Sequence, residues 1–143
     1  VKFGISFTTI HLNQAGALVH LYTDGSVYLN HGGIEMGQGT HTKIAQVVAN
    51  SLGLPYEKIK ISSTNTTKVP NTYASAAYST TDLNAAAALN AASKIKKNLE
   101  KFIKDKYKIF SKEEPIYKNE TIIFGNRSFE FKKIVMEAYL TRV

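Results

Sequence analysis

The stretch HGGIEMGQGTHTKIAQ, residues 31–46, places four glycines around one Glu, one Met and one Gln before its pattern becomes helical. Apolar residues then follow at helical spacing as far as Leu52, which predicts a helix with Thr40 as its N-cap and Gly53 just past its end. A β-rich run precedes the glycines. The order of strand, glycine loop and helix organises this part of the chain, and with the elements on either side it indicates an α+β fold.

The glycine loop fits neither of the two common phosphate-binding motifs. A Walker loop needs a Gly-Lys pair, which the chain lacks, and the dinucleotide fingerprint needs a third glycine where Thr42 stands. What remains is a loop before a helix N-terminus, where backbone N–H groups can face a polar or anionic ligand. Gly37 and Gly39 would let a flat ligand approach the main chain, and Gln38 offers a donor and an acceptor. A tight turn that binds nothing stays the alternative.

Upstream of the loop, Asp24-Gly25 predicts a two-residue hairpin turn between strands over Ala15–Thr23 and Ser26–His31. Such a turn fixes the register. The expected cross-strand pairs are Tyr22 with Val27, His20 with Leu29, Leu21 with Tyr28 and Val19 with Asn30. Because both faces of this hairpin would carry large apolar groups, we expect both faces to be covered.

Downstream, Ile59–Ser62 reads as a short strand, followed by a long polar segment without periodicity, a kind of loop that is usually functional or disordered. From Asp82 a single long helix is expected to reach Tyr107, capped by Thr81 or by Asp82 itself. The alanine-rich first half of that helix has little side-chain bulk. Another backbone can therefore come close to it.

Residues after Pro115 suggest a further small unit. ETIIFGNRSFEF, residues 120–131, predicts a hairpin, and FKKIVMEAYLTRV, residues 131–143, predicts a helix. We therefore expect a core over residues 1–114 and an extension over residues 115–143. Because the last helix has no C-cap signal, we also expect the chain to be a fragment, truncated inside a larger protein.

The net charge of +7 is concentrated in one segment. Residues 94–108 hold seven lysines against two acidic residues and supply +5 of it. Apolar residues at i, i+4, i+7 and i+8 give this segment one apolar face, so the lysines read as a solvated helix face. A basic nucleic-acid-binding module is the alternative of a different class, but the chain has only two arginines for bidentate phosphate or guanine contacts.

The absence of cysteine excludes several sites in this chain: disulfides, thiolate zinc sites, iron–sulfur ligation and cysteine nucleophiles. No apolar run approaches the roughly 20 residues that cross a bilayer, and no signal peptide opens the sequence. The composition, 43% hydrophobic and 20% charged, is typical of soluble globular proteins. We expect a cytoplasmic protein without membrane contact.

Several segments together carry a resemblance to a known family. They are FGISFTTIHLNQAGALVHLYTDGSVYLNHG, GGIEMGQG, HTKIAQVVANSLGLP and VPNTYASAAYSTTDLNAAA. They resemble the molybdopterin-binding large subunit of the molybdenum hydroxylase family, and FTTIHLNQAG favours its xanthine dehydrogenase branch over the aldehyde oxidases. The resemblance runs along essentially the whole chain. A related hydroxylase acting on aldehydes or other N-heterocycles stays the alternative within the family.

The resemblance implies a molybdenum–molybdopterin cofactor, bound by the pterin with no protein side chain ligating the metal. It implies purine catabolism, with hypoxanthine or xanthine hydroxylated toward urate. Iron–sulfur clusters and FAD would lie on other domains or chains, so the expected partners are the rest of the molybdenum subunit, an iron–sulfur/FAD subunit or domain, and the purine. The family's catalytic glutamate belongs to a Gly-Val-Gly-Glu segment that this sequence lacks, so no catalytic residue is expected here, and the fragment alone should be inactive.

Site residues are carried over from the family position by position. Gln38, between Gly37 and Gly39, matches the glutamine beside the pterin. A second cofactor-binding loop comprises Ala76, Ala77, Tyr78, Ser79 and Thr80. Phe7, Thr8 and Ala77 match residues bordering the substrate, with the phenylalanine ring against the flat heterocycle. Tyr78 stands where the family usually has serine.

Other tempting residues have simpler readings. Glu35, the one carboxylate of the glycine loop, has no acid or nucleophile beside it in the sequence, so we expect it to accept backbone N–H bonds and not to act as a base. The four histidines lack the His-x-x-x-His spacing of a zinc site.

Overall fold

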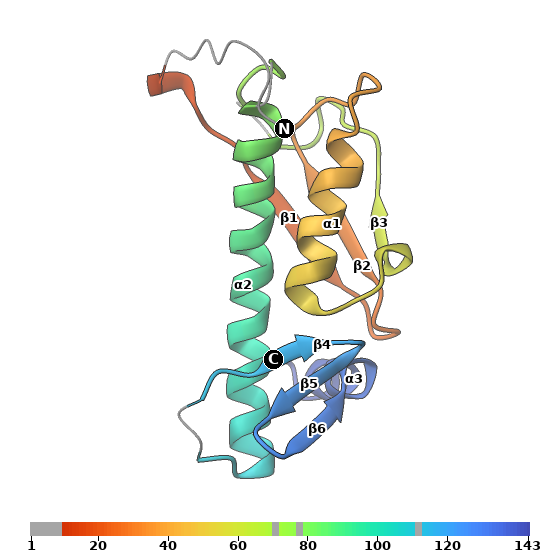
Figure 1. The fold of residues 1–143 in the computed structure, drawn as a ribbon, viewed down its shortest axis with the longest axis vertical. Coiled ribbons are helices and arrows are strands. Elements are labelled where there is room, and N and C mark those ends of the chain that lie inside the picture. Colours follow the sequence, from red (N-terminus) through yellow and green to blue (C-terminus); the bar gives the residue numbers. More distant parts are fainter. Residues whose placement is uncertain (1–9, 70–71, 77–78, 111–112) are drawn as a thin grey trace.

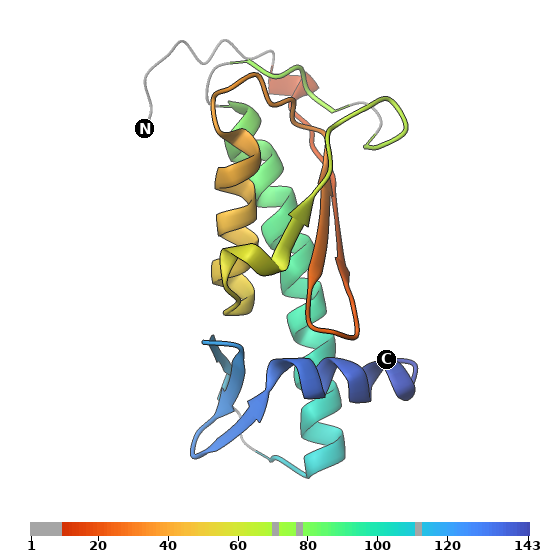
Figure 2. The same ribbon diagram turned by 90° about the vertical axis from the view of Figure 1, so that its right-hand side faces the viewer.

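The computed structural model describes residues 10–69, 72–76, 79–110 and 113–143. A three-stranded sheet, in the order β1-β2-β3, packs one of its faces against two helices, α1 and α2. A second three-stranded sheet, β4-β5-β6, and helix α3 lie beside the C-terminal half of α2 (Figures 1 and 2). This arrangement confirms the α+β class.

The first two strands, β1 (Ala17–Leu21) and β2 (Val27–His31), form the expected hairpin but with a different turn. The Gly25 N–H bonds the Tyr22 carbonyl at 2.9 Å, and the Tyr22 N–H bonds the Ser26 carbonyl at 2.9 Å, which leaves a three-residue loop. Gly25 takes the left-handed conformation at φ 83° that such a loop needs. The predicted two-residue turn is therefore wrong, and so is the register, by one residue.

The shift in register changes the two faces of the hairpin. Val19 pairs with Leu29, so the buried side chains of both strands share one face against the helices. The other face carries Leu18, which is 52% exposed, and the exposed His20. The expectation that both faces are covered is wrong for the described part of the chain.

Helix α1 (Thr40–Leu52) crosses over the sheet and leads, through the short 3-10 helix η2 (Tyr56–Lys58), to strand β3 (Ile59–Ile61). β3 runs parallel to β2. The N-cap is Gly39, at φ 77° and without a side-chain cap, so the predicted Thr40 cap is wrong. Gly53 ends the helix in the left-handed conformation, as predicted.

Helix α2 (Ser79–Tyr107) starts three residues earlier than expected, which makes the Thr81 and Asp82 cap assignments wrong. An acidic residue suits the first turn of a helix as well as its cap, so the pattern could not separate the two positions. Ala88 and Ala92 are fully buried where α2 packs along α1. The close approach expected of the alanines is confirmed.

The C-terminal part consists of strands β4 (Ile116–Lys118), β5 (Thr121–Phe124) and β6 (Arg127–Glu130) and helix α3 (Phe131–Leu140). The β5–β6 hairpin and α3 were predicted, whereas β4, only three residues long, was not. A short 3-10 helix, η1 (Ile10–Leu12), precedes the first sheet.

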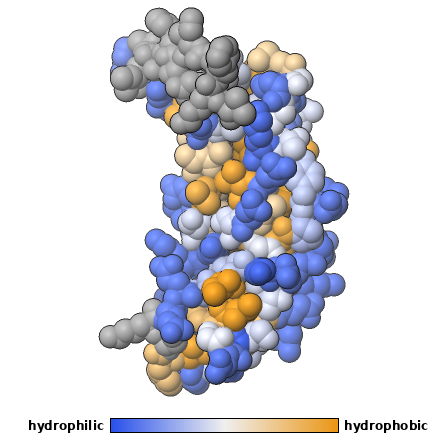
Figure 3. Space-filling view, viewed as in Figure 1, coloured by the Kyte–Doolittle hydropathy of each residue, from blue (hydrophilic) through white to orange (hydrophobic). Residues whose placement is uncertain are grey.

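Residues 115–143 share one apolar core with the rest of the chain. The Tyr117 hydroxyl donates to the Lys96 carbonyl at 3.2 Å, and the Glu120 N–H donates to the Gly53 carbonyl at 2.8 Å. These bonds attach the small sheet to α2 and to the end of α1. On the face seen in Figure 3, hydrophobic side chains gather over this small sheet among hydrophilic ones.

Candidate functional site

The glycine loop and the start of α2 meet at one end of the molecule (Figure 1). β2 and β3 are parallel, so both strands end there, beside the first turns of both long helices. In open α/β sheets, ligands bind outside the carboxyl ends of the strands. The Ile34 N–H donates to the Ser75 hydroxyl at 2.8 Å, which joins the glycine loop to the segment before α2.

Glu35 organises the turn from β2 into α1. Its Oε1 accepts N–H bonds from Gly37 at 2.8 Å and Gly39 at 3.0 Å, and its Oε2 accepts the His41 N–H at 2.9 Å. These three backbone bonds lower the pKa of Glu35 to about 2. The prediction that Glu35 serves as an acceptor for backbone N–H groups is confirmed.

The side chain of Gln38 folds back on its own loop. Its Oε1 accepts the Met36 N–H at 2.6 Å, and its Nε2 donates to the Ile34 carbonyl at 2.8 Å. The N–H groups of Gly37 and Gly39, which the sequence suggested for a ligand, are thus already bonded to Glu35. Each amide atom of Gln38 keeps one hydrogen-bonding valence for another group.

The side of the loop where the glycines lack side chains is open. A Cβ built on Gly37 would meet no atom within 4 Å, and one built on Gly39 would meet only the end of Lys43 at 4.0 Å. Both glycines have positive φ, 95° and 77°. The described chain therefore leaves room for a ligand against this backbone.

Beneath the loop lies His31, which is only 3% exposed. Burial, helped by the neighbouring His41 and Lys68, lowers its pKa to about 4. Its Nδ1 accepts the Gly33 N–H at 3.0 Å, so in the neutral ring Nε2 carries the proton. No group of three or more metal-ligating side chains is found in the described ranges.

Several buried polar atoms at this end have no hydrogen-bond partner within the described chain. They are Thr40 Oγ1, Thr80 Oγ1, Asn84 Oδ1 and the Nε2 atoms of His31 and His41. Thr80 is 3% exposed, and a Cβ built on Gly33 would lie 3.0 Å from its methyl group. Buried polar atoms are nearly always paired, so we expect these atoms to meet a polar group beyond the described residues, such as a bound ligand or water.

The structure places some of the predicted site residues and leaves others out. Ser79 and Thr80 are buried in the first turn of α2, and Ala76 accepts a 2.6 Å hydrogen bond from the Ser79 hydroxyl. Phe7, Thr8, Ala77 and Tyr78 lie outside the described residues.

Sequence reasoning missed three polar residues at this end. Thr64 donates to the Gly33 carbonyl at 2.7 Å, and Asn84 donates to the Thr80 carbonyl at 2.8 Å. Ser75 is the third, through its bond with Ile34. The position of Asn84 could have been recognised from the sequence. It stands one helical turn after Thr80 at the start of an alanine-rich helix, so a side-chain bond to Thr80 could be expected.

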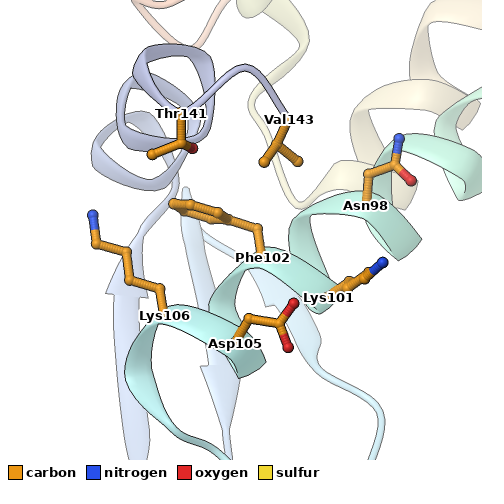
Figure 4. Close-up of a pocket in the computed structure, with 7 residues that line it drawn as sticks. All are labelled: Asn98, Lys101, Phe102, Asp105, Lys106, Thr141 and Val143. Carbon is orange, nitrogen blue, oxygen red and sulfur yellow. The ribbon is translucent and has the colours of Figure 1, made fainter.

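A hollow of about 760 Å³ lies elsewhere, between the second half of α2 and the residues after α3 (Figure 4). Phe102 forms part of its wall, with Lys101 and Asp105 on the same helix. At about 1.5 Å per helical residue, Phe102 stands roughly 30 Å along α2 from Thr80. The hollow is therefore separate from the glycine loop. None of the described helices is long and apolar enough to span a membrane.

Comparison with known proteins gives consistent matches. The family model described as "Molybdopterin cofactor-binding domain" matches residues 1–143. The xanthine dehydrogenase/oxidase of Gallus gallus is 62% identical over 99 residues, which are 69% of this chain and 7% of that protein. The xanthine dehydrogenase of Oryza sativa subsp. japonica is 57% identical over 99 residues, again 69% and 7%. The chain thus spans less than a tenth of the length of these relatives.

Solved structures share the fold. Quinoline 2-oxidoreductase from Pseudomonas putida 86 matches with a TM-score of 0.80 and 21% identity, over 90% of this chain and 16% of that one. Reconstituted CO dehydrogenase from Oligotropha carboxidovorans also gives a TM-score of 0.80, with 22% identity over 92% of this chain and 16% of that one. At such identities the likeness establishes the fold alone.

Proposed function

The chain belongs to the molybdopterin cofactor-binding domain family, and on this premise we propose that it forms part of a xanthine dehydrogenase-type molybdenum hydroxylase. The activity is oxidation of hypoxanthine and xanthine toward urate, in purine catabolism in the cytoplasm. Support comes from the names of the curated relatives. The remaining parts of the enzyme are the rest of the molybdenum subunit and the iron–sulfur and FAD centres.

The observation that carries the proposal is the convergence of the two predicted cofactor segments. Among the described residues, each amide atom of Gln38 on the glycine loop keeps one hydrogen-bonding valence, and Thr80 Oγ1 at the first turn of α2 has no partner. We assign both residues to the binding of the pterin, together with Ala76, Ala77, Tyr78 and Ser79. The open backbone side of Gly37 and Gly39 leaves room for a flat ring.

When bound, the molybdenum–pterin centre supplies hydroxylation of an electron-poor carbon by two-electron oxidation. The residues of this chain bind the cofactor and orient the substrate. Phe7 and Thr8 are assigned to the wall of the substrate pocket, where an aromatic face would hold a flat purine. The carboxylate that moves the proton in this family lies in a segment outside this chain.

Replacing Gly37 with valine tests the cofactor assignment. In the complete protein, Gly37→Val should remove most of the molybdenum and pterin, because the side chain would fill the open side of the loop. The matched control is Gly125→Val in the β5–β6 turn. Both glycines have positive φ, 95° and 54°, and an added Cβ has no contact closer than 3.8 Å at either position.

Strain from positive φ should therefore lower the melting temperature of both variants, whereas only Gly37→Val should lose cofactor. The measurement is molybdenum and pterin per folded protein beside a thermal melt. Full cofactor content in folded Gly37→Val would refute the site.

A further inference from the structure

The turn that leads into α1 has the form of an anion-binding nest. Backbone N–H groups of Gly37, Gly39 and His41 converge on the two oxygens of one carboxylate, and the positive φ values of the two glycines shape the concavity. Such a nest at a helix N-terminus favours a negative charge. In this chain the carboxylate of Glu35 occupies it.

The side chains of Glu35 and Gln38 hold the loop through hydrogen bonds to each other's neighbouring backbone groups. Glu35 bonds the N–H groups just before and just after Gln38 in the sequence, while the Gln38 amide bonds Ile34 and Met36 on either side of Glu35. The Lys43 ammonium also donates to the Gln38 carbonyl at 3.0 Å. Loss of the carboxylate would therefore free the backbone that carries Gln38.

We propose that Glu35 is a positioning residue: it fills the nest with the chain's own anion and so holds Gln38 in its cofactor-binding position before the cofactor arrives. This inference rests on the proposed function. It assigns the N–H groups of the nest to Glu35 and leaves Gln38 and the start of α2 to meet the pterin. Pre-organisation of this kind lowers the cost of ordering the loop on binding.

Glu35→Gln in the complete protein removes the charge and places an NH₂ group where an acceptor stood. Amide hydrogen exchange at Gly37, Gly39 and His41 in the cofactor-free protein should accelerate at least tenfold. Molybdenum per folded protein should fall severalfold. The matched control is Glu57→Gln, an exposed carboxylate on η2, which should change neither quantity.

A variant with a shorter acidic side chain still tests the proposal if Glu35→Gln does not fold. Glu35→Asp preserves the charge with less reach, so its exchange and molybdenum content should lie between those of wild type and Glu35→Gln. The wild-type protein offers a third measurement, titration of the Glu35 carboxyl carbon, where a midpoint near 2 is expected. An ordinary carboxyl midpoint would overturn the inference.

Unchanged amide exchange in Glu35→Gln, or fast exchange with full molybdenum content, would likewise overturn it. Failure of the proposed function looks different, because the wild-type protein itself would then contain no molybdopterin. In that case the exchange measurement still decides whether Glu35 holds the loop.

Discussion

At the scale of single residues, the candidate site depends on groups that the fold keeps in one protonation state. His31 is buried with its Nδ1 accepting a backbone N–H, and its neutral form is favoured because charging it would require desolvation of a cation. Glu35 is held in the opposite sense, as an anion, by three N–H donors. His31 is the last residue of β2, and Glu35 lies between β2 and α1.

The buried His31 predicts acid sensitivity. Its pKa falls from 6.5 to about 4 on folding, so the unfolded chain binds more protons between those values and stability should drop as pH falls through that window. Between pH 7 and 5 we expect a loss of about 2 kcal/mol in the free energy of unfolding. Urea unfolding at the two pH values measures it.

Glu35 does not interfere with this measurement, because its contribution is lost only as pH falls from 4.5 toward 2. His31→Gln should flatten the pH dependence, whereas His20→Gln, on the exposed face of β1, should leave it as in wild type. A wild-type stability that does not change between pH 7 and 5 would contradict the neutral, buried assignment of His31.

At the scale of elements, a single glycine sets how closely α1 approaches the small sheet. A Cβ built on Gly53 would lie 2.4 Å from the Lys118 nitrogen and from the Tyr117 carbonyl carbon. Gly53 also accepts the Glu120 N–H through its carbonyl. The end of α1 and the β4–β5 turn are therefore in backbone contact.

Gly53→Ala should be severely destabilising. Left-handed φ costs alanine roughly 1–2 kcal/mol, and displacing the β4 backbone should add roughly 1–3 kcal/mol. Gly125→Ala serves as the control, since Gly125 also has positive φ but its nearest neighbour would be 3.8 Å from the added Cβ. Chemical denaturation gives both values. Equal losses in the two variants would show that only backbone strain matters at residue 53.

The elements also show what local sequence patterns can determine. The sequence correctly predicted the end of α1 from Gly53 and a close helix contact from the alanines of α2. Both predictions depend only on the residues at those positions. The hairpin register was wrong because Asp24-Gly25 suits both two- and three-residue loops. The choice depends on bonds such as that from the Ser26 N–H to the Asp24 carboxylate at 2.8 Å. Because the predicted pairing was shifted by one residue, it placed the wrong side chains of the two strands on the same face.

At the scale of the whole molecule, the candidate site joins segments about 40 positions apart in the sequence, such as Ile34 and Ser75. Periodicity cannot bring such segments together, and a three-residue β3 gives little warning of a parallel pairing with β2. The resemblance to a family supplied that long-range information. The division into residues 1–114 and 115–143 remains a proposal. One apolar core spans both parts.

At the scale of the whole molecule, the lysines of residues 94–108, which supply +5 of the net charge of +7, lie away from the site. Helix α2 is 29 residues long, with the candidate site at its first turn and the lysines along its second half. At about 1.5 Å per residue, Lys94 lies roughly 20 Å from Thr80 and Lys101 roughly 30 Å. The Debye length at physiological ionic strength is only about 8 Å, so these exposed charges should have little effect on a cofactor at that end.

Reversing the exposed lysines separates the proposed function from the nucleic-acid alternative. In the complete protein, the triple variant Lys94→Glu, Lys97→Glu and Lys101→Glu should keep the wild-type molybdenum content and turnover of xanthine, because all three side chains are exposed and far from the glycine loop. Molybdenum per protein and binding to duplex DNA at 50 and 200 mM salt should be measured side by side. The alternative requires a wild-type protein without molybdenum and a DNA affinity that falls steeply with salt and disappears in the triple variant. That combination would refute the proposed function, whereas a molybdenum-loaded variant without DNA affinity would leave the lysines as an ordinary solvated helix face.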